Sequence, residues 1–330
     1  MSKFFALIRS RYSGILLEPT RVFYLAISLA LLIVFTVFSL ANPRFFTASN
    51  LLNVLRQASP TLISAVAMTI VITLSGIDLS IGSLLAVVAV LSAMALGAGW
   101  NALLVVVAVL IIGSGMGAVN GFFAAYQKIP AFIVTLATLS VYRGLALLLT
   151  HGYSLPIPPN SPFIFIGRGW VLGVPVPVWI ALAVVIIGYI VFYKTPFGLY
   201  VTGIGSNEEA VRRAGVNVKR VKFWAYVLSG SLTAIAGMIV AARVAAGSSY
   251  IGVGFELTVI ASVIVGGTNL FGGEGRMLGT VIGTLLLALI SNGLVMIHVS
   301  AFYQQVVEGV ILLLAIWFNK GASLLGNNKG

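Results

Sequence analysis

Long apolar runs, separated by short polar breaks, are the feature of this 330-residue sequence that most constrains its fold. Of all residues, 60% are hydrophobic and only 8% are charged, whereas soluble domains carry roughly a quarter charged residues. Seven acidic and 19 basic residues cannot cover the surface of a soluble globule of this size. Most of the chain must therefore lie in lipid.

The apolar runs divide into segments close to the length of a membrane-spanning helix, which needs about 20 apolar residues. Charged residues, prolines and glycines set their limits. We expect ten spans, near residues 22–41, 60–75, 80–97, 102–126, 131–150, 175–193, 223–244, 257–270, 277–297 and 302–319. The sequence thus predicts an all-α polytopic membrane protein in which residues 1–330 form a single transmembrane domain.

The basic residues are distributed unevenly over the loops between these segments. If the N-terminus is cytoplasmic, fourteen of the 19 basic residues lie inside, four lie outside and Arg143 lies within a span. The inside set is Lys3, Arg9, Arg11, Arg21, Lys128, Lys194, Arg212, Arg213, Lys219, Arg220, Lys222, Arg276, Lys320 and Lys329; the outside set is Arg44, Arg56, Arg168 and Arg243. Because cytoplasmic loops carry the excess of Lys and Arg, we expect both termini and the longest inside loop, residues 194–222, in the cytoplasm.

Several kinds of chemistry lack the residues they need. The chain has no cysteine, and its two histidines, His151 and His298, belong to no HExxH pattern. No GxxxxGK[ST] loop is present to hold a nucleotide phosphate. The basic residues flank membrane segments instead of forming one basic face with aromatics, which argues against nucleic acid as a partner. We therefore expect no catalytic residue, no metal site and no cofactor bound by this chain.

A six-residue pattern with an acid in its third position occurs twice, at residues 76–81 (Gly-Ile-Asp-Leu-Ser-Ile) and 254–259 (Gly-Phe-Glu-Leu-Thr-Val). Weaker echoes follow in the same order, such as Asn120-Gly121 and Asn292-Gly293. The repeat predicts two halves of five spans, about residues 22–150 and 175–319. An odd number of spans inverts the second half relative to the first, as in transporters that alternate between two access states. The alternative is a duplicated scaffold with no moving part.

The segments beside the two copies are expected to be short. Residues 60–75 would cover about 24 Å at 1.5 Å per residue, less than a hydrocarbon core of about 30 Å. Residues 257–270 form a still shorter segment. Short segments interrupted by glycine, at matching places in two halves, indicate a binding site in a membrane protein.

Polar residues within the apolar segments are the candidates for this site. Asp78 is the sole aspartate, and an intramembrane carboxylate costs at least about 2.5 kcal/mol unless it meets a partner or water. Asp78 and Glu256 either cap the helices that follow them or line a pathway. Asparagine and glutamine amides at span depth bond either a hydroxylated solute or a neighbouring helix. The candidate pathway residues are Asp78, Ser80, Asn120, Glu256, Asn269, Asn292 and Gln304.

Three glycines at four-residue spacing, Gly113, Gly117 and Gly121, favour close helix packing.

The inside loop 194–222 contains the signals of one short helix. Ser206 or Asn207 is placed to cap the N-terminus of the helix, and two acidic residues follow. Two arginines occupy the last turn, and Gly215 can adopt the left-handed conformation that ends a helix. Isolated helices of this length are marginal in water, so this one needs something to pack against. Either it docks on a cytoplasmic ATPase that supplies nucleotide energy, or it lies on its own protein and contacts lipid headgroups. The candidate coupling residues are Asn207, Glu208, Glu209, Ala210, Arg212, Arg213 and Gly215.

Four stretches together resemble a known family: Leu74–Ser83, Pro196–Gly198 leading into Gly205–Ala210, Gly254–Leu257, and Ile264–Gly273. They are similar to the permease subunits of ABC importers for monosaccharides, ribose and autoinducer-2 permeases among them, which are related to branched-chain amino acid permeases. The order of motifs runs from about residue 40 to residue 318. One departure is Gly205-Ser206-Asn207, where the family usually has Gly-Gly-Asn before the acids.

The resemblance implies a permease in the bacterial inner membrane, working with a second permease copy or a sister permease. It also implies cytoplasmic ABC ATPase subunits that use ATP and Mg, and an external solute-binding protein. The helix at residues 207–214 would be the coupling helix, seated in a groove of the ATPase, and Asp78 and its neighbours would lie near the pathway.

The function expected from the sequence is ATP-driven import of a small hydroxylated solute, a monosaccharide first of all, by alternating access. One alternative is the same type of importer for branched-chain amino acids or nucleosides. Another is an ion- or proton-coupled carrier in which Asp78 and Glu256 titrate. A membrane-embedded enzyme is disfavoured, since no nucleophile, base and orienting group occur at recognisable spacing.

Overall fold

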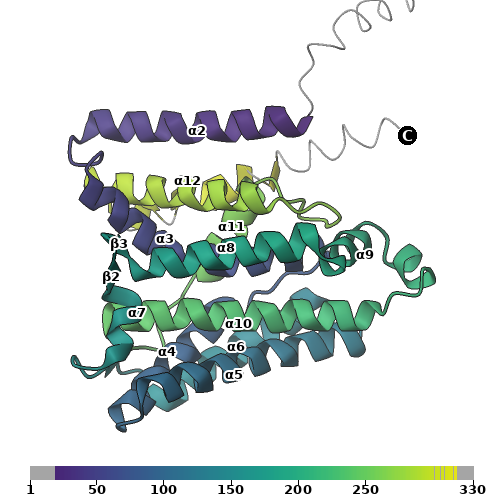
Figure 1. Cartoon of the computed structure of the whole chain (residues 1–330), viewed down its shortest axis with the longest axis horizontal. Coiled ribbons are helices and arrows are strands. Elements are labelled where there is room, and N and C mark those ends of the chain that lie inside the picture. The colour runs from purple at the N-terminus through teal and green to yellow at the C-terminus, as the bar shows by residue number, and fades with distance from the viewer. Residues whose placement is uncertain (1–18, 301, 305, 308, 315, 318–330) are drawn as a thin grey trace, which may run out of the picture.

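A computed structural model describes residues 19–300, 302–304, 306, 307, 309–314, 316 and 317 of the chain. Long helices lie side by side through the molecule, with α2 at one edge and α5 and α6 at the other (Figure 1). The predicted cytoplasmic position of the termini depends in part on residues outside this described part of the chain, namely Lys3, Arg9, Arg11, Lys320 and Lys329.

The elements of the first half are α2 (Pro19–Ala41), α3 (Ala48–Thr73), α4 (Ile81–Gly97), α5 (Ala102–Gly121), the π-helical turn η1 (Phe122–Tyr126) and α6 (Ala131–Thr150). A small extension follows, with β1 (Leu155–Pro156), η2 (Pro162–Ile164), α7 (Phe165–Arg168), β2 (Trp170–Val171) and β3 (Val174–Pro175). The second half has α8 (Val176–Lys194), α9 (Pro196–Arg213), α10 (Val218–Val244), β4 (Ala246–Gly247), α11 (Phe255–Val265) and α12 (Met277–Met296). Strand β1 pairs antiparallel with β4, with Leu155 opposite Gly247, and β2 pairs with β3.

Seven helices in the described part of the chain are long and apolar enough to cross a bilayer: α2, α3, α5 with η1, α6, α8, α10 and α12. Three further apolar helices are shorter, namely α4, α11 and Phe302–Leu314, the last of which includes positions outside the description. Each of the ten predicted segments overlaps one of these helices in order. The all-α polytopic class is confirmed, whereas the count of ten spans and the side on which the termini lie stay predictions.

Helix α3 is longer than the sequence suggested. It begins at Ala48, where the hydroxyl of the N-cap Thr47 accepts a hydrogen bond from Asn50, and it contains Pro60 in its interior. At 1.5 Å per residue its 26 residues extend about 39 Å. The predicted short segment 60–75 was therefore wrong, because a proline inside a membrane helix ends it less often than one in water. The second predicted short segment is confirmed, since α11 has only 11 residues.

The centre of the molecule consists of α3, α4, α10 and α11, which supply most of the largest buried cluster. Nearly all of α4 is buried, including Leu84 and Leu85. The glycine stripe of α5 lies against α10, where a Cβ on Gly117 would overlap the Tyr226 carbonyl and one on Gly121 would crowd Phe223. The packing interpretation of that stripe is thus confirmed.

The contacts between helices follow a reciprocal pattern. Helix α5 packs against α10, and α12 packs against α3. Helix α4 lies against α10 and α5, and α11 lies in the same way against α3 and α12. Under the predicted repeat, α3, α4 and α5 correspond to α10, α11 and α12, so the contacts of α4 with α5 and α10 have counterparts in those of α11 with α12 and α3.

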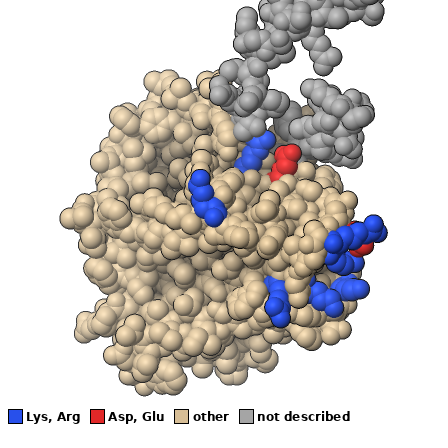
Figure 2. All heavy atoms as spheres, turned by 45° about the vertical axis from the view of Figure 1, so that its right-hand side comes forward, with Lys and Arg blue, Asp and Glu red and all other residues tan. Residues whose placement is uncertain are grey.

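Basic residues predicted on the same side of the membrane lie at the same end of the bundle. Lys128, Lys219 and Lys222 line one cavity near the junction of α9 and α10, the end where Figure 2 shows Lys and Arg side chains gathered. Arg44 and Arg56 line another cavity near the start of α3, at the opposite end of the long helices (Figure 1). We refer to these as the inner and outer ends, in keeping with the predicted orientation.

Candidate functional site

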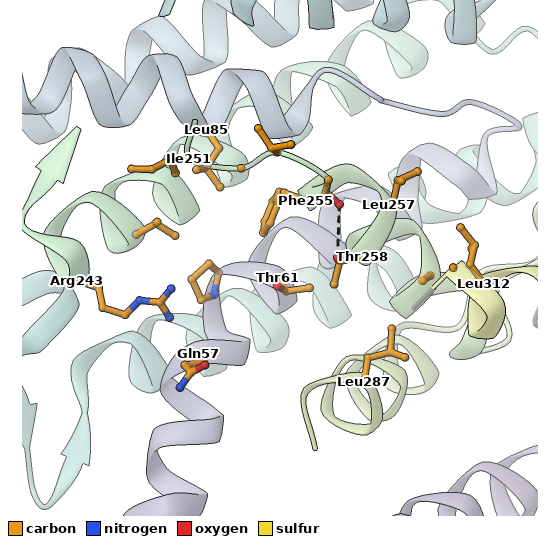
Figure 3. Close-up of a pocket in the computed structure, with 17 residues that line it drawn as sticks. Gln57, Thr61, Leu85, Arg243, Ile251, Phe255, Leu257, Thr258, Leu287 and Leu312 are labelled. Atoms are coloured by element: carbon orange, nitrogen blue, oxygen red, sulfur yellow. Dashed lines mark hydrogen bonds between the residues drawn. The ribbon is translucent and has the colours of Figure 1, made fainter. Parts of the chain in front are cut away.

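A cavity of about 580 Å³ lies between α3, α4, α10, α11, α12 and the helix that follows α12 (Figure 3). This volume falls within the range of about 300–1,000 Å³ that is usual for small-molecule sites. Much of the lining is apolar, including Leu85, Phe255 and Leu287, and residues 251–255 before α11 form one wall. We call this space the outer cavity because Arg243, at the outer end of α10, lines it.

A few polar groups project into the outer cavity among these apolar side chains. Gln57 and Thr61 share one face of α3 because they are four residues apart, and Arg243 reaches in from the last turn of α10 (Figure 3). Within the described residues, Nη1 of Arg243 is buried and has no hydrogen-bond partner. Apolar walls with a few hydrogen-bonding groups suit a small solute that carries several hydroxyl groups, because such a molecule presents both C–H faces and oxygens.

The two copies of the repeated motif meet next to this cavity, at the N-terminal ends of α4 and α11. A Cβ on Gly82 would overlap the Glu256 carboxylate and the Gly252 carbonyl, and a Cβ on Gly252 would overlap the Gly82 carbonyl. Gly252 also has a φ of 74°, a conformation that other residues rarely adopt. From α6, Nη1 of Arg143 donates hydrogen bonds to the carbonyls of Ser249 and, at 2.9 Å, Ile251. The turn before α11 is thereby held both by α4 and by α6.

Asp78 is fully buried at the centre of a hydrogen-bonded cluster. Its Oδ1 accepts hydrogen bonds from the Ser80 amide at 3.1 Å and the Ser80 hydroxyl at 2.7 Å, and its Oδ2 accepts one from the Ser229 hydroxyl at 2.7 Å. Asn120 donates to Ser80 at 2.8 Å and accepts from Thr138 at 2.8 Å. The cluster joins the start of α4 to α5, α6 and α10, and Asp78 binds the amide of Ser80, the residue directly before α4. Asp78 lines neither the outer cavity nor the cavities beside Lys128 and Arg44.

The other candidate pathway residues lie apart from this cluster. Asn292 exchanges two amide hydrogen bonds with Asn50 of α3, at 2.9 and 3.2 Å. Gln304 donates to the Val299 carbonyl at 3.0 Å, and Asn269 accepts from the Phe271 amide at 3.0 Å in the loop between α11 and α12. The structure therefore brings together Asp78, Ser80 and Asn120, places Glu256 at the crossing of α4 and α11, and leaves the remaining three in separate contacts.

The predicted cytoplasmic helix is present as the second arm of α9. Asn207 has a non-helical backbone, with φ −157° and ψ 94°, and divides α9 into two helices. Its Oδ1 accepts a hydrogen bond from the Ala210 amide at 2.9 Å, and Gly215 follows the last turn with φ 84°. The predicted cap and stop are confirmed. The first arm, residues 196–206, is a helix that was not predicted.

Ion pairs hold this second arm together and connect it to α10. Arg212 pairs with Glu208 at 2.8 Å and with Glu209 at 2.9 Å, and Arg213 pairs with Glu209 at 3.1 Å. Lys222, at the start of α10, donates to Glu208 at 2.6 Å. The hydrogen bond from Lys222 is the largest influence on Glu208 and holds the pKa of its carboxyl below the usual 4.5.

The first arm of α9 contacts the loops that precede α4 and α12. A Cβ on Gly205 would overlap the Thr73 carbonyl. The Ser75 hydroxyl donates to the Gly205 carbonyl at 3.3 Å and to the Phe271 carbonyl at 2.9 Å, and the Gly273 amide donates to the Thr73 carbonyl at 3.0 Å. A displacement of α9 would therefore reach both loops directly.

The polar residues that line the outer cavity were not among the predicted site residues. Gln57 and Thr61 could be recognised as polar residues four positions apart in an apolar helix. Arg243 could be recognised as a cation in the last turn of another apolar helix. The sequence does not show, however, that α3 lies beside α10. In the described part of the chain, no three His, Asp or Glu side chains are grouped so as to hold a metal ion.

Comparison with known proteins assigns the chain to a family. Residues 50–316 match the model described as "Branched-chain amino acid transport system / permease component". The chain is 40% identical to the ribose import permease protein RbsC of Haemophilus influenzae, over 87% of this chain and 90% of that protein. It is 42% identical to RbsC of Escherichia coli K12, over 87% and 91% of the two chains, and 32% identical to the xylose transport system permease protein XylH of the same strain, over 93% and 94%. No solved structure matches the chain. This membrane protein thus belongs to the family of branched-chain amino acid transport system permease components.

Proposed function

We propose that the chain is the membrane permease subunit of an ATP-driven importer for a monosaccharide, located in the bacterial inner membrane. The observation that carries this proposal is the identity of 40–42% with ribose import permeases over 87% of this chain. A xylose permease is also similar over nearly the full length. The substrate class is therefore a pentose or a related sugar and not an amino acid, although the family description names amino acids.

The outer cavity is the proposed part of the route that receives the sugar. Gln57, Thr61 and Arg243 offer donors and acceptors for hydroxyl groups, and the leucines and Phe255 pack against C–H faces. The sugar would be delivered by an external solute-binding protein at the outer end, where Arg44 and Arg56 lie close together. A second permease copy or a sister permease would complete the route.

The energy would come from cytoplasmic ABC ATPase subunits, which hold ATP and Mg. The second arm of α9 would seat in a groove of the ATPase as a coupling helix, and closure of the ATPase would move it. The contacts of Gly205 with Thr73 and of Ser75 with Phe271 would carry that movement to the loops before α4 and α12. The reciprocal helix contacts support two inverted halves, about residues 22–150 and 175–319, that rock about the crossing of α4 and α11.

The proposal is tested by uptake of labelled ribose and xylose in proteoliposomes that contain the permease, its ATPase and its binding protein. Uptake should require ATP and the binding protein, and leucine should not be carried. Thr61→Val should lower the apparent affinity for the sugar severalfold, because it removes one hydroxyl at nearly constant volume. Thr36→Val, on the exposed face of α2, is the control and should have no effect. Uptake that continues without the ATPase and follows an ion gradient would refute the proposal.

The coupling role of α9 has its own test. The double charge reversal Glu208→Arg with Glu209→Arg removes the four ion pairs of the second arm while leaving the membrane helices unaltered. We expect ATP hydrolysis to continue without sugar uptake. Arg220→Glu, which reverses an exposed charge at the same end but outside α9 and the two loops it contacts, should preserve coupling. Normal uptake in the double variant would reject the coupling role.

A further inference from the structure

A second cavity, of about 500 Å³, lies at the inner end and has no role in the proposed sugar route. Four segments form its wall: residues 74–76 after α3, residues 124–131 from η1 to α6, the second arm of α9, and the start of α10. We call it the inner cavity. It is separate from the outer cavity, with which it shares no lining residue.

The inner cavity is strongly cationic. Lys128, Arg212, Lys219 and Lys222 line it, against a single carboxylate, Glu208, so positive charge exceeds negative charge by three. Arg212 and Lys222 already share Glu208. Lys128 and Lys219 are exposed, and in the described part of the chain neither forms an ion pair; Lys219 lies 6.0 Å from the ring of Tyr126. A concave surface with this imbalance attracts anions.

A buried hydroxyl at the wall of this cavity is also unsatisfied. Tyr226 is only 3% exposed, and its hydroxyl has no hydrogen-bond partner within the described residues. The hydroxyl lies next to Gly76, where an added Cβ would stand 2.6 Å from it. A buried polar group without a partner destabilises the folded protein. An oxygen of a bound anion would supply the missing partner while the lysines balance its charge.

We propose that the inner cavity binds a phosphate-bearing anion, either a soluble sugar phosphate or the headgroup of an anionic phospholipid. A phosphate offers several oxygens, enough to meet two lysines and a tyrosine hydroxyl at once, and lysine is a common phosphate ligand. The ligand would join Lys128 of the loop between η1 and α6 to Lys219 of α10, beside the second arm of α9. Its occupancy would therefore oppose displacement of that arm.

The test measures binding of D-ribose 5-phosphate and inorganic phosphate to the full chain by isothermal titration calorimetry. The protein is placed in nanodiscs of phosphatidylcholine alone, and uncharged ribose serves as the reference. We expect Lys128→Gln with Lys219→Gln to weaken binding about tenfold, because two exposed charge contacts with the anion are removed. Tyr226→Phe should weaken binding severalfold without lowering the thermal unfolding midpoint, because it deletes only an unpartnered hydroxyl.

The matched control is Lys194→Gln with Arg220→Gln, which removes the same charge from the same end but outside the cavity. A second set of nanodiscs contains phosphatidylglycerol. Sugar-phosphate binding that persists in this set supports a soluble ligand. A lipid headgroup is supported by two results together. Sugar-phosphate binding is lost in these nanodiscs, and native mass spectrometry finds phosphatidylglycerol bound to the wild type but not to the Lys128 and Lys219 variant. An equal loss in the control variant, or no binding of phosphate ester, phosphate or phosphatidylglycerol, overturns the proposal. None of these outcomes depends on sugar uptake.

Discussion

At the scale of single residues, Asp78 shows how a carboxylate is kept at membrane depth. Its two oxygens accept three hydrogen bonds from Ser80 and Ser229, while Asn120 fixes Ser80 from α5. No cation pairs with it among the described residues. The stability of the buried group therefore depends on the surrounding hydroxyl and amide donors, which come from different helices.

We expect Asp78→Ala to destabilise the chain strongly, by about 3 kcal/mol or more, because it leaves several buried donors without an acceptor. Asp78→Asn should cost less, since it keeps one acceptor oxygen. The measurement is thermal unfolding of the purified full chain in detergent. Ser114→Ala is a suitable control, because it breaks one neutral hydroxyl contact with Ser231 between α5 and α10 and should cost about 1 kcal/mol. If Asp78→Ala unfolds like the wild type but transports no sugar, Asp78 acts in the pathway and its structural role is minor.

Glu208 gives a prediction of pH dependence outside the membrane. Because Lys222 lowers the pKa of Glu208 in the folded state, its contribution is complete above the ordinary value of 4.5 and is lost as the pH falls through the lower folded-state value. The Glu208 side chain is 39% exposed, so the contribution is below about 1 kcal/mol. Glu208→Gln should therefore increase hydrogen exchange in residues 208–214 at pH 7 and leave it unchanged well below pH 4.5. A difference of equal size at both pH values would contradict this assignment.

Features that depend on neighbouring residues, such as the ends of a helix, could be predicted from the sequence. Features that depend on residues far apart in the chain, such as the lining of a cavity, could not. The cap at Asn207 and the stop at Gly215 follow from chemistry within one turn of helix. The outer cavity depends on Thr61 of α3 lying near Arg243 of α10, which are far apart in sequence. A single sequence shows that both residues are polar but does not show that they lie close together.

At the scale of elements, α9 consists of two helical arms divided at Asn207 instead of one short helix. Its second arm carries the ion pairs with Arg212 and Arg213, and its first arm is fixed against the end of α3. Residues 196–206 lack acidic and basic signals and begin with Pro-Phe-Gly, so they resembled a loop in the sequence. In the structure these residues are helical, and Gly205 packs closely against the Thr73 carbonyl.

Gly205→Ala tests whether this contact is essential. The new methyl group would overlap the Thr73 carbonyl, which forces α9 away from α3. We expect sugar uptake to fall at least tenfold with little change in the amount of protein in the membrane, because Gly205 is only partly buried and lies at the inner end of the bundle. Gly115→Ala is the matched control, a helical glycine of α5 whose Cβ would meet nothing within 4 Å. Uptake equal in the two variants would exclude a tight joint at Gly205.

The misjudged start of α3 has a similar physical origin. Arg56 and Pro60 were read as the border of a span, because both are expected outside the hydrocarbon. In the structure the Arg56 guanidinium lies 4.8 Å from the centre of the Trp170 ring, and Pro60 lines the outer cavity. Both residues are thus accommodated by protein contacts that a hydropathy pattern does not contain.

At the scale of the whole molecule, α4 and α11 are both too short to cross the bilayer. With 17 and 11 residues they cover about 26 and 17 Å, less than the hydrocarbon core. The non-helical turns before them must then be satisfied by protein. Before α4, Asp78 accepts a hydrogen bond from the Ser80 amide. Before α11, Arg143 donates hydrogen bonds to the carbonyls of residues 249 and 251. The sequence repeat predicted matching breaks, and the reciprocal contacts support the inverted halves, which stay a prediction.

The orientation of the bundle is the prediction on which the direction of transport depends, and the absence of cysteine makes it directly testable. Ser49 and Ser206 are both exposed, near the start of α3 and in α9 respectively, at opposite ends of the long helices. Ser49→Cys and Ser206→Cys each introduce a single thiol of nearly the same size as the hydroxyl. Because the excess of basic residues places α9 inside, a membrane-impermeant maleimide added to intact cells should label only the cysteine at position 49. Position 206 should become reactive only after the inner membrane is opened. Labelling of position 206 in intact cells would place α9 on the outer side, where no ATP-driven subunit could act on it.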